Sequence, residues 1–438
     1  MVIFNYPVLF LAQIILIIFS IYWLIRRNDV VPLLMASFLF YVASYRYWSV
    51  TSGLGRWVNV TAFISNNPEL DGLNALGSIV FGQICLLGTY CYCQKQTIPV
   101  ATVGNNNSIL SWLRPKVLFF GLACLPIVIA TRSSVLAQMS SGKSIAFEVN
   151  GYLYLFPMVL IGIAVLVMTL WKFGGLPSVL DKLWATVILL GVFSLTFNPA
   201  SRFQFIGWII ASGIILSSFY QPRKRLLVFA VAAVIGIGLF AVAGSMRNRA
   251  LSNVSLEQAA IERALSAEDG NMLDGFVIVR SVFPKHLNFR YGMEHLEILM
   301  RPIPRSLWAG KPVGGAYMEH LGLSDAETGM TVGFSPTLFG SFYVDGGMFG
   351  IVFWSLIYGW AMAKIIGYSI RLKPFAGIIV RAILCACLIP LLRGGDLAGI
   401  YAWVGMAFWP CFLLLWFKRH ELRKVILIPK HLLLQHHR

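Results

Sequence analysis

Long apolar stretches, separated by short polar connections, dominate the chain. A helix that crosses about 30 Å of hydrocarbon needs about 20 mostly apolar residues, and many stretches meet or approach that length. These stretches lie near residues 5–25, 30–48, 74–94, 117–136, 151–171, 183–198, 203–220, 226–245, 335–364, 375–392 and 397–417. The pattern predicts an all-α polytopic membrane protein with about eleven transmembrane helices.

One connection differs from the others in length and composition. Residues 246–334, which we call the cap loop, hold more than half of the acidic residues and are too long for a simple turn. Two helices are predicted within it, because Ser255-Leu-Glu-Gln258 matches a capping box and Met293–Met300 has helical periodicity. The predicted organisation is eight transmembrane helices in 1–245, the cap loop, three helices in 335–417 and a basic tail in 418–438.

Composition and charge support a membrane protein and predict its orientation. Hydrophobic residues make up 58% of the chain and charged residues only 12%, which excludes an ordinary soluble domain. In such a protein the net charge of +17 indicates cytoplasmic anchoring and anionic lipid or phosphate ligands, and no nucleic-acid partner is expected. The first cations, Arg26 and Arg27, follow the first apolar stretch. The positive-inside rule therefore predicts an external N-terminus, an external cap loop and a cytoplasmic tail.

Basic residues also recur on the predicted outer side, where this rule leads us to expect few. They stand at helix ends and in the cap loop: Arg46, Arg132, Arg202, Arg247, Arg249, Arg301, Arg305, Lys311 and Arg393. Contact with bulk lipid phosphates accounts for any one of them. Together they suit a phosphate or pyrophosphate ligand, which a guanidinium group binds through two parallel donors.

Motifs for nucleotide or metal chemistry are absent from the sequence. There is no Walker A loop, no GxSxG elbow and no HExxH, and the predicted outer side has no Asp-x-Asp pair. We therefore expect no cofactor and no metal. Fixed cations would stabilise phosphate in their place.

Two stretches of the sequence carry the candidate chemistry. Arg301–Pro312, RPIPRSLWAGKP, is a cationic strip stiffened by three prolines. Gly333–Gly350, GFSPTLFGSFYVDGGMFG, is rich in glycine, which predicts a kinked or re-entrant entry into the ninth span. Its Asp345 is a candidate general base or ion-pair partner, and Glu294 and His295 are the other candidate bases.

Together with NPASRF at the outer start of an earlier helix, these stretches resemble the Wzy-type oligosaccharide repeat-unit polymerases of bacterial O-antigen and related surface polysaccharides. The likeness in motifs covers residues 200–350, and elsewhere only the topology is similar. It implies a GT-C-type enzyme of the bacterial inner membrane whose basic motifs include Arg202, Arg305 and Lys311. Ser341 stands where the family often has an acidic residue, so Asp345 is a substitute candidate.

The resemblance implies glycosyl transfer at the periplasmic face. Undecaprenyl-pyrophosphate-linked repeat units are the expected donor and acceptor, and Arg202, Arg305 and Lys311 would hold the departing pyrophosphate. Substrate binding is assigned to Arg247, Arg249, Arg301, Trp308 and Arg393. Membrane lipids, a chain-length regulator and a flippase are the other expected partners.

Two alternatives remain open. An O-antigen ligase uses the same donor but transfers its glycan to a lipid A core. A flippase or transporter moves lipid-linked sugar without forming a bond, and such proteins favour ionisable residues near the middle of the bilayer. In this sequence the charges concentrate at the predicted outer surface and in the cap loop, which favours an enzyme.

Overall fold

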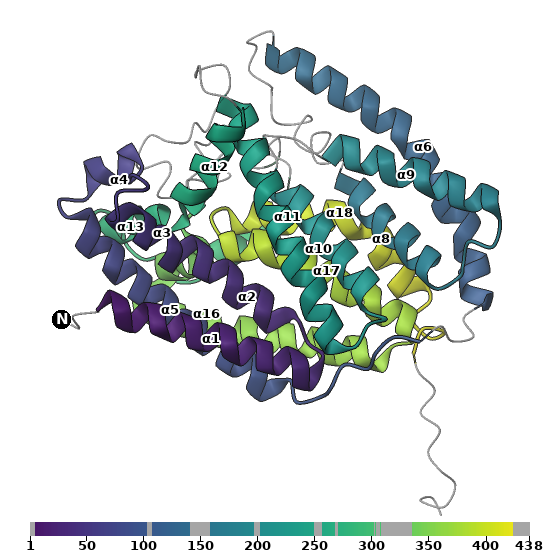
Figure 1. Ribbon diagram of the computed structural model, residues 1–438, viewed down its shortest axis with the longest axis horizontal. Coiled ribbons are helices and arrows are strands. Elements are labelled where there is room, and N and C mark those ends of the chain that lie inside the picture. Colours follow the sequence, from purple (N-terminus) through teal and green to yellow (C-terminus); the bar gives the residue numbers. More distant parts are fainter. Residues whose placement is uncertain are drawn as a thin grey trace, which may run out of the picture.

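The computed structural model is a bundle of helices (Figure 1). It describes residues 5–102, 107–140, 158–196, 202–248, 256–267, 270–301, 303, 307 and 335–423. The helices of the first part are α1 (Tyr6–Arg27), α2 (Val31–Leu39), the π-helix η1 (Phe40–Tyr45), α3 (Arg46–Thr51), α4 (Asn59–Ile64), α5 (Pro68–Cys93), α6 (Asn107–Ser140), α8 (Val159–Lys172), α9 (Val179–Thr196), α10 (Arg202–Ser217) and α11 (Pro222–Asn248). The remainder are α12 (Leu256–Ser266), α13 (Met272–Val282), α14 (Met293–Met300), α16 (Thr337–Arg371), α17 (Pro374–Arg393) and α18 (Leu397–Phe417).

The predicted polytopic membrane character is confirmed in its coarser form. Within the described residues, six helices are long and apolar enough to cross a membrane: Tyr6–Arg27, Pro68–Cys93, Ser108–Ala130, Thr337–Arg371, Pro374–Arg393 and Leu397–Phe417. Val159–Lys172 and Phe205–Ser217 are shorter apolar helices. The full number of eleven spans, and the placement of the cap loop outside the membrane, stay predictions.

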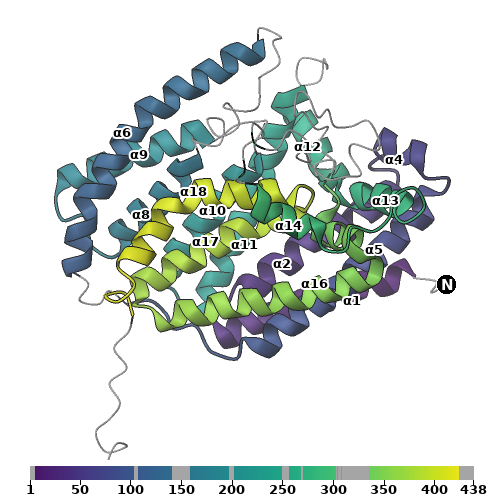
Figure 2. The same ribbon diagram turned by 180° about the vertical axis from the view of Figure 1, so that it is seen from behind.

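The two ends of the bundle differ in structure and charge. The short helices α4, α12, α13 and α14 gather at one end, which we call the cap end (Figures 1 and 2). The opposite end, which we call the basic end, carries Arg27, Lys172, Arg371 and Lys418, where α1, α8, α16 and α18 finish. The cations of these connections therefore lie together, as the positive-inside rule leads us to expect of a cytoplasmic surface.

The predicted orientation can be tested by the reactivity of cysteine substitutions in cells. In a background without the seven native cysteines, we expect cysteine at exposed Glu262, in α12, to react with a maleimide that cannot cross the membrane holding the protein. Cysteine at exposed Lys95, at the basic end, should react only after that membrane is permeabilised. The reverse pattern would place the cap end in the cytoplasm and contradict the predicted topology.

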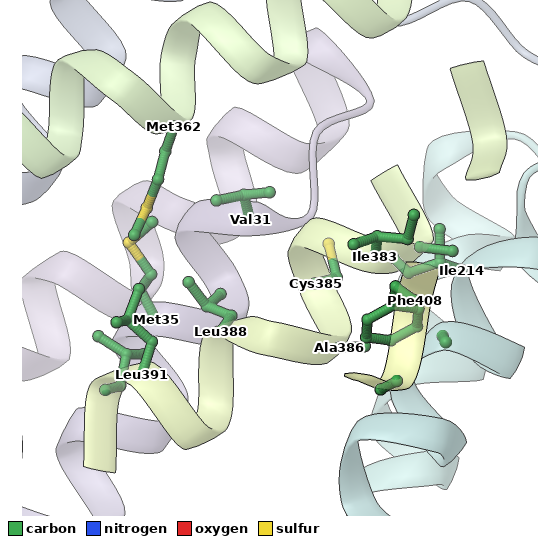
Figure 3. Close-up of a cluster of buried hydrophobic side chains, with 14 of the residues drawn as sticks. Val31, Met35, Ile214, Met362, Ile383, Cys385, Ala386, Leu388, Leu391 and Phe408 are labelled. Carbon is green, nitrogen blue, oxygen red and sulfur yellow. The ribbon is translucent and has the colours of Figure 1, made fainter. Parts of the chain in front are cut away.

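The core of the bundle is centred on α17. Figure 3 shows Met35 and Leu388 among the packed apolar side chains, and both are fully buried. On the other side of α17, α10 approaches closely through Gly207, because a Cβ at that position would lie 3.0 Å from the carbonyl oxygen of Ala386. Small residues allow such backbone proximity between apolar helices. This contact also fixes the relative height of α10 and α17.

A buried ion pair joins the cap loop to the rest of the bundle. Arg46, at the start of α3, donates from Nε and Nη2 to the two carboxylate oxygens of Asp274 in α13, at 2.9 and 3.1 Å. Its Nη1 also donates to the carbonyl oxygen of Ser266, which ends α12. Arg46 is only 1% exposed. It was predicted to lie with the arginines of the outer surface, but here its guanidinium group joins three elements of the protein and is withdrawn from solvent.

Candidate active site

A carboxylate and an imidazole lie in contact where the cap loop packs against α16. Asp345 lies in α16, and its Oδ2 is 2.8 Å from Nδ1 of His295 in α14. Its Oδ1 accepts a hydrogen bond from the backbone N–H of Gly292, at 3.0 Å. The ring of His295 stacks on Trp354, with centroids 3.4 Å apart. Nε2 of His295 is buried and has no hydrogen-bond partner among the described residues.

A kink in α16 positions Asp345. The helix is interrupted at Gly346 and Gly347, where φ is 177° and 63°. Because an interrupted helix leaves carbonyl groups without helical partners, these must find other donors. The carbonyl of Asp345 accepts from the N–H of Tyr291, and a similar bond joins Arg290 to Val344, each at 2.9 Å. The kink predicted from the glycine-rich stretch is therefore confirmed, and it serves as the docking point for the chain that leads into α14.

The acidic face of α14 points into the protein. Arg290 forms ion pairs with both Glu294 and Glu297. Glu294 is buried, whereas Leu296 and Leu299 on the other side of the helix are exposed. Burial raises the pKa of Glu294 to about 8, despite the opposing effect of Arg290, whose single guanidinium group is shared between two carboxylates.

The raised pKa of Glu294 predicts a pH dependence of local stability. A carboxyl group whose pKa rises on folding contributes fully below its ordinary pKa of 4.5, and that contribution is lost as the pH rises through about 8. We therefore expect amide hydrogen exchange in α14, corrected for intrinsic rates, to become faster across this range. Glu294→Gln should remove most of the pH dependence, whereas Glu297→Gln, which keeps the buried acid, should retain it. An unchanged pH dependence in Glu294→Gln would contradict this assignment.

Arginine positions converge at the cap end of α10 and α17. The two helices run antiparallel, since α10 begins at the cap end and α17 finishes there. Along the helix axes, the distance from the contact between Gly207 and Ala386 toward the cap end is similar for Arg202 and Arg393. The two positions therefore stand at nearly the same level of the bundle. Arg393 is partly buried. Two of the predicted phosphate ligands are thus carried by neighbouring helices at one level of the bundle.

The turn between α17 and α18 gathers further groups around Arg393. Arg301, at the end of α14, lies 3.5 Å from the carboxylate of Asp396. The N–H of Gly395 donates to the hydroxyl of Ser341 at 3.1 Å. Gly394 has a φ of 69°, and a Cβ there would lie only 2.1 Å from the backbone of Thr337, so this turn requires glycine. The start of α16 and the end of α14 are therefore both held beside Arg393.

Helix α14 carries both the imidazole of His295 and, directly after its end, Arg301. His295 is near the start of α14 and Arg301 directly follows its end. Their Cα positions are separated by about 9 Å along the axis at the usual rise per residue. The imidazole and the ion pair of Arg301 with Asp396 are thus carried by one short helix.

The predicted site residues are distributed unevenly over the structure. Glu294, His295 and Asp345 form one cluster, and Arg301 lies beside the turn that carries Arg393. The structure describes the backbones of Arg202 and Arg247 within α10 and α11. The remaining predicted residues lie outside the described residues: Arg249, Arg305, Trp308 and Lys311.

Sequence reasoning missed three residues of this region. The ion pair of Arg290 could have been predicted, because Arg290 precedes Glu294 at a spacing that often marks an ion pair. Trp354 and Asp396 carried no local signal, since their partners His295 and Arg301 are distant in sequence. In the part of the chain that the structure describes, no group of three or more His, Cys, Asp and Glu side chains is placed to hold a metal ion.

No family model, curated protein or solved structure matches this chain.

Proposed function

We propose that the protein is a glycosyltransferase that polymerises undecaprenyl-pyrophosphate-linked oligosaccharide repeat units, as its resemblance to the Wzy-type polymerases implies. The observation that carries the proposal is the convergence of Arg202, Arg393 and Arg301 at the cap end, one short helix away from the pair of His295 and Asp345. Cations placed where a pyrophosphate departs, next to a group that accepts a proton, are what such a transfer needs.

The proposed reaction exchanges one bond for another. A hydroxyl oxygen of the incoming unit attacks the anomeric carbon of the growing chain, and the bond from that carbon to the pyrophosphate oxygen breaks. The electron pair of the broken bond leaves with the lipid pyrophosphate. Arginines at the cap end stabilise this developing charge, and they do so best when fixed before the reaction begins. The hydroxyl proton passes to a base on the protein.

Among the candidate bases, His295 has a nitrogen that can accept the hydroxyl proton. Both oxygens of Asp345 are engaged, one by Gly292 and one by His295, and Glu294 is paired with Arg290. When Asp345 accepts a hydrogen bond from Nδ1–H, the lone pair of His295 lies on Nε2. Because Nε2 is covered in this conformation, the acceptor hydroxyl reaches it only after the covering side chains move.

The product formed by purified protein tests this proposal against its alternatives. The protein is reconstituted in nanodiscs with a defined undecaprenyl-pyrophosphate-linked repeat unit and a chelator, since no metal requirement is expected. A ladder of lengthened lipid-linked glycans supports a polymerase. Transfer only to an added lipid A core would instead identify a ligase. Movement of the lipid-linked unit across proteoliposomes, with no new glycosidic bond, would identify a transporter and refute the proposal.

A further inference from the structure

Helix α14 presents apolar side chains outward and charged side chains inward. Met293, Leu296 and Leu299 are 39%, 45% and 76% exposed. The two glutamates of the helix both pair with Arg290 on its inner side. A helix on a water-exposed surface has the opposite arrangement, with its charged side chains toward the solvent. The outward face of α14 therefore has the composition of a surface that apolar groups cover.

The contacts of His295 give the depth of α14 along the membrane-spanning helices. Its ring stacks on Trp354 and lies 5.7 Å from the ring of Tyr358, both in α16. At the usual rise per residue, Tyr358 and Trp354 stand about 20 and 25 Å from Arg371, which ends α16 at the basic end. These distances are upper limits along the membrane normal, because a tilt of α16 shortens them. Since the hydrocarbon is about 30 Å thick, the imidazole lies within its depth.

Helix α18 gives the same depth from the cap end. The hydroxyl of Tyr401 donates to that of Tyr358 at 3.2 Å, and Tyr401 stands about one turn inside the start of α18 at Leu397. Arg301, directly after α14, pairs with Asp396, directly before α18. Helix α14 therefore runs beside the outermost turns of α16 and α18 and ends level with the start of α18 (Figure 2).

The neighbouring surface of α16 is apolar and exposed as well. Phe349, Phe353 and Leu356 are exposed and recur at helical spacing, so they form one stripe along a membrane-spanning helix. The rings of Phe353 and Trp354 have centroids 5.2 Å apart, and His295 stacks on Trp354. The outward face of α14 therefore lies next to the surface that α16 presents to lipid.

We propose that α14 lies in the membrane leaflet at the cap end, with its outward face in contact with lipid acyl chains. Charged groups at this depth face the protein interior and pair with one another, as Arg290 and the two glutamates do. Part of the cap loop is thus inserted into the bilayer, and lipid covers one side of the helix that carries His295. This placement goes beyond the proposed function, since it holds whichever reaction the site performs.

Spin labels measure the depth of α14 in the full-length protein. Single cysteines at Leu296 and Leu299, in a background without the seven native cysteines, are labelled with a nitroxide and placed in nanodiscs of phosphatidylethanolamine and phosphatidylglycerol. Oxygen concentrates in hydrocarbon and a nickel chelate stays in water, so power saturation yields the logarithm of the ratio of their collision rates. We expect a positive logarithm at both positions, as at Leu356 in α16, and a negative one at exposed Glu262 in α12.

Two results of this measurement would overturn the proposal. A negative logarithm at Leu296 and Leu299 would place the outward face of α14 in water. Low collision rates with both reagents would show that protein covers it instead of lipid. Because both side chains are exposed, the labels replace no packed group, and thermal unfolding confirms that each labelled protein is folded.

A matched pair of charged variants supplies a second test. Leu299→Glu places a charge against lipid and should speed amide exchange in α14 about fivefold, which corresponds to about 1 kcal/mol. Ile261→Glu introduces the same charge at an exposed apolar position of α12 and should leave exchange in α12 near normal. Unchanged exchange in Leu299→Glu, or equal acceleration in the two helices, would contradict the contact of α14 with lipid.

Discussion

Arg393→Ala is expected to lower polymerisation by about 10²–10³-fold, the loss that follows removal of one donor to a developing charge. Arg202→Ala should have an effect of the same order, since it stands at the same height on the adjoining helix. Lysine should restore little activity at either position, because an ammonium group cannot reproduce the planar pair of donors that guanidinium offers to phosphate. The initial rate of chain extension by purified variants measures each loss.

Arg371→Ala is the matched control for these variants. Arg371 is an exposed arginine that ends a membrane-spanning helix at the basic end, away from the cap. Its removal should leave the rate near that of the unchanged protein. Near-normal extension by Arg393→Ala or Arg202→Ala, or full rescue of both by lysine, would contradict the role assigned to them. The resemblance predicts the same loss for Arg305→Ala and Lys311→Ala.

Arg46→Ala is expected to destabilise the protein by about 3–5 kcal/mol, the cost of leaving a buried charge without its partner. Asp274, its partner, is fully buried and also accepts a hydrogen bond from the N–H of Val58, so it cannot turn to solvent. The loss should appear as a lower midpoint of thermal unfolding in detergent and as faster proteolysis at the cap end.

A surface ion pair of the same chemistry provides the control. Arg114 and Asp181 lie 3.4 Å apart with side chains 34% and 19% exposed, so Arg114→Ala should change stability by less than about 1 kcal/mol. Replacing both buried partners, by Arg46→Met with Asp274→Leu, should recover much of the loss, because no unpaired charge then remains. Equal effects of Arg46→Ala and Arg114→Ala would show that the buried pair does not anchor the cap.

Much of the helical organisation could be predicted from local patterns. Leu256–Ser266 and Met293–Met300 match the two helices expected within the cap loop, because a capping box, apolar spacing and the proline after Arg301 act over a few residues. The kink at Gly346 and Gly347 was predictable for the same reason, since the φ of 63° at Gly347 is a conformation that favours glycine.

Contacts between distant segments could not be predicted from the sequence. Arg46 and Asp274 are far apart along the chain, and nothing local distinguishes Arg46 from an arginine that contacts lipid. Which face of α14 is buried could not be predicted from the sequence either. The periodicity of this helix distinguishes an apolar face from an acidic face. The acidic face is the buried one, because Arg290 and the kink of α16 lie beneath it. An apolar groove between α1, α2, α10 and α11 could not be predicted either, because its walls come from four helices that each have an ordinary apolar sequence.

The central claim is that each new glycosidic bond releases one lipid pyrophosphate at the arginines of the cap end. Purified protein in nanodiscs, supplied with a defined undecaprenyl-pyrophosphate-linked repeat unit, allows both products to be counted in one reaction by mass spectrometry and chromatography. The account predicts equal amounts of new glycosidic bonds and free undecaprenyl pyrophosphate, with both reduced to the same extent in Arg393→Ala. Bond formation without release of the lipid pyrophosphate, or no bond formation by folded protein, would contradict it.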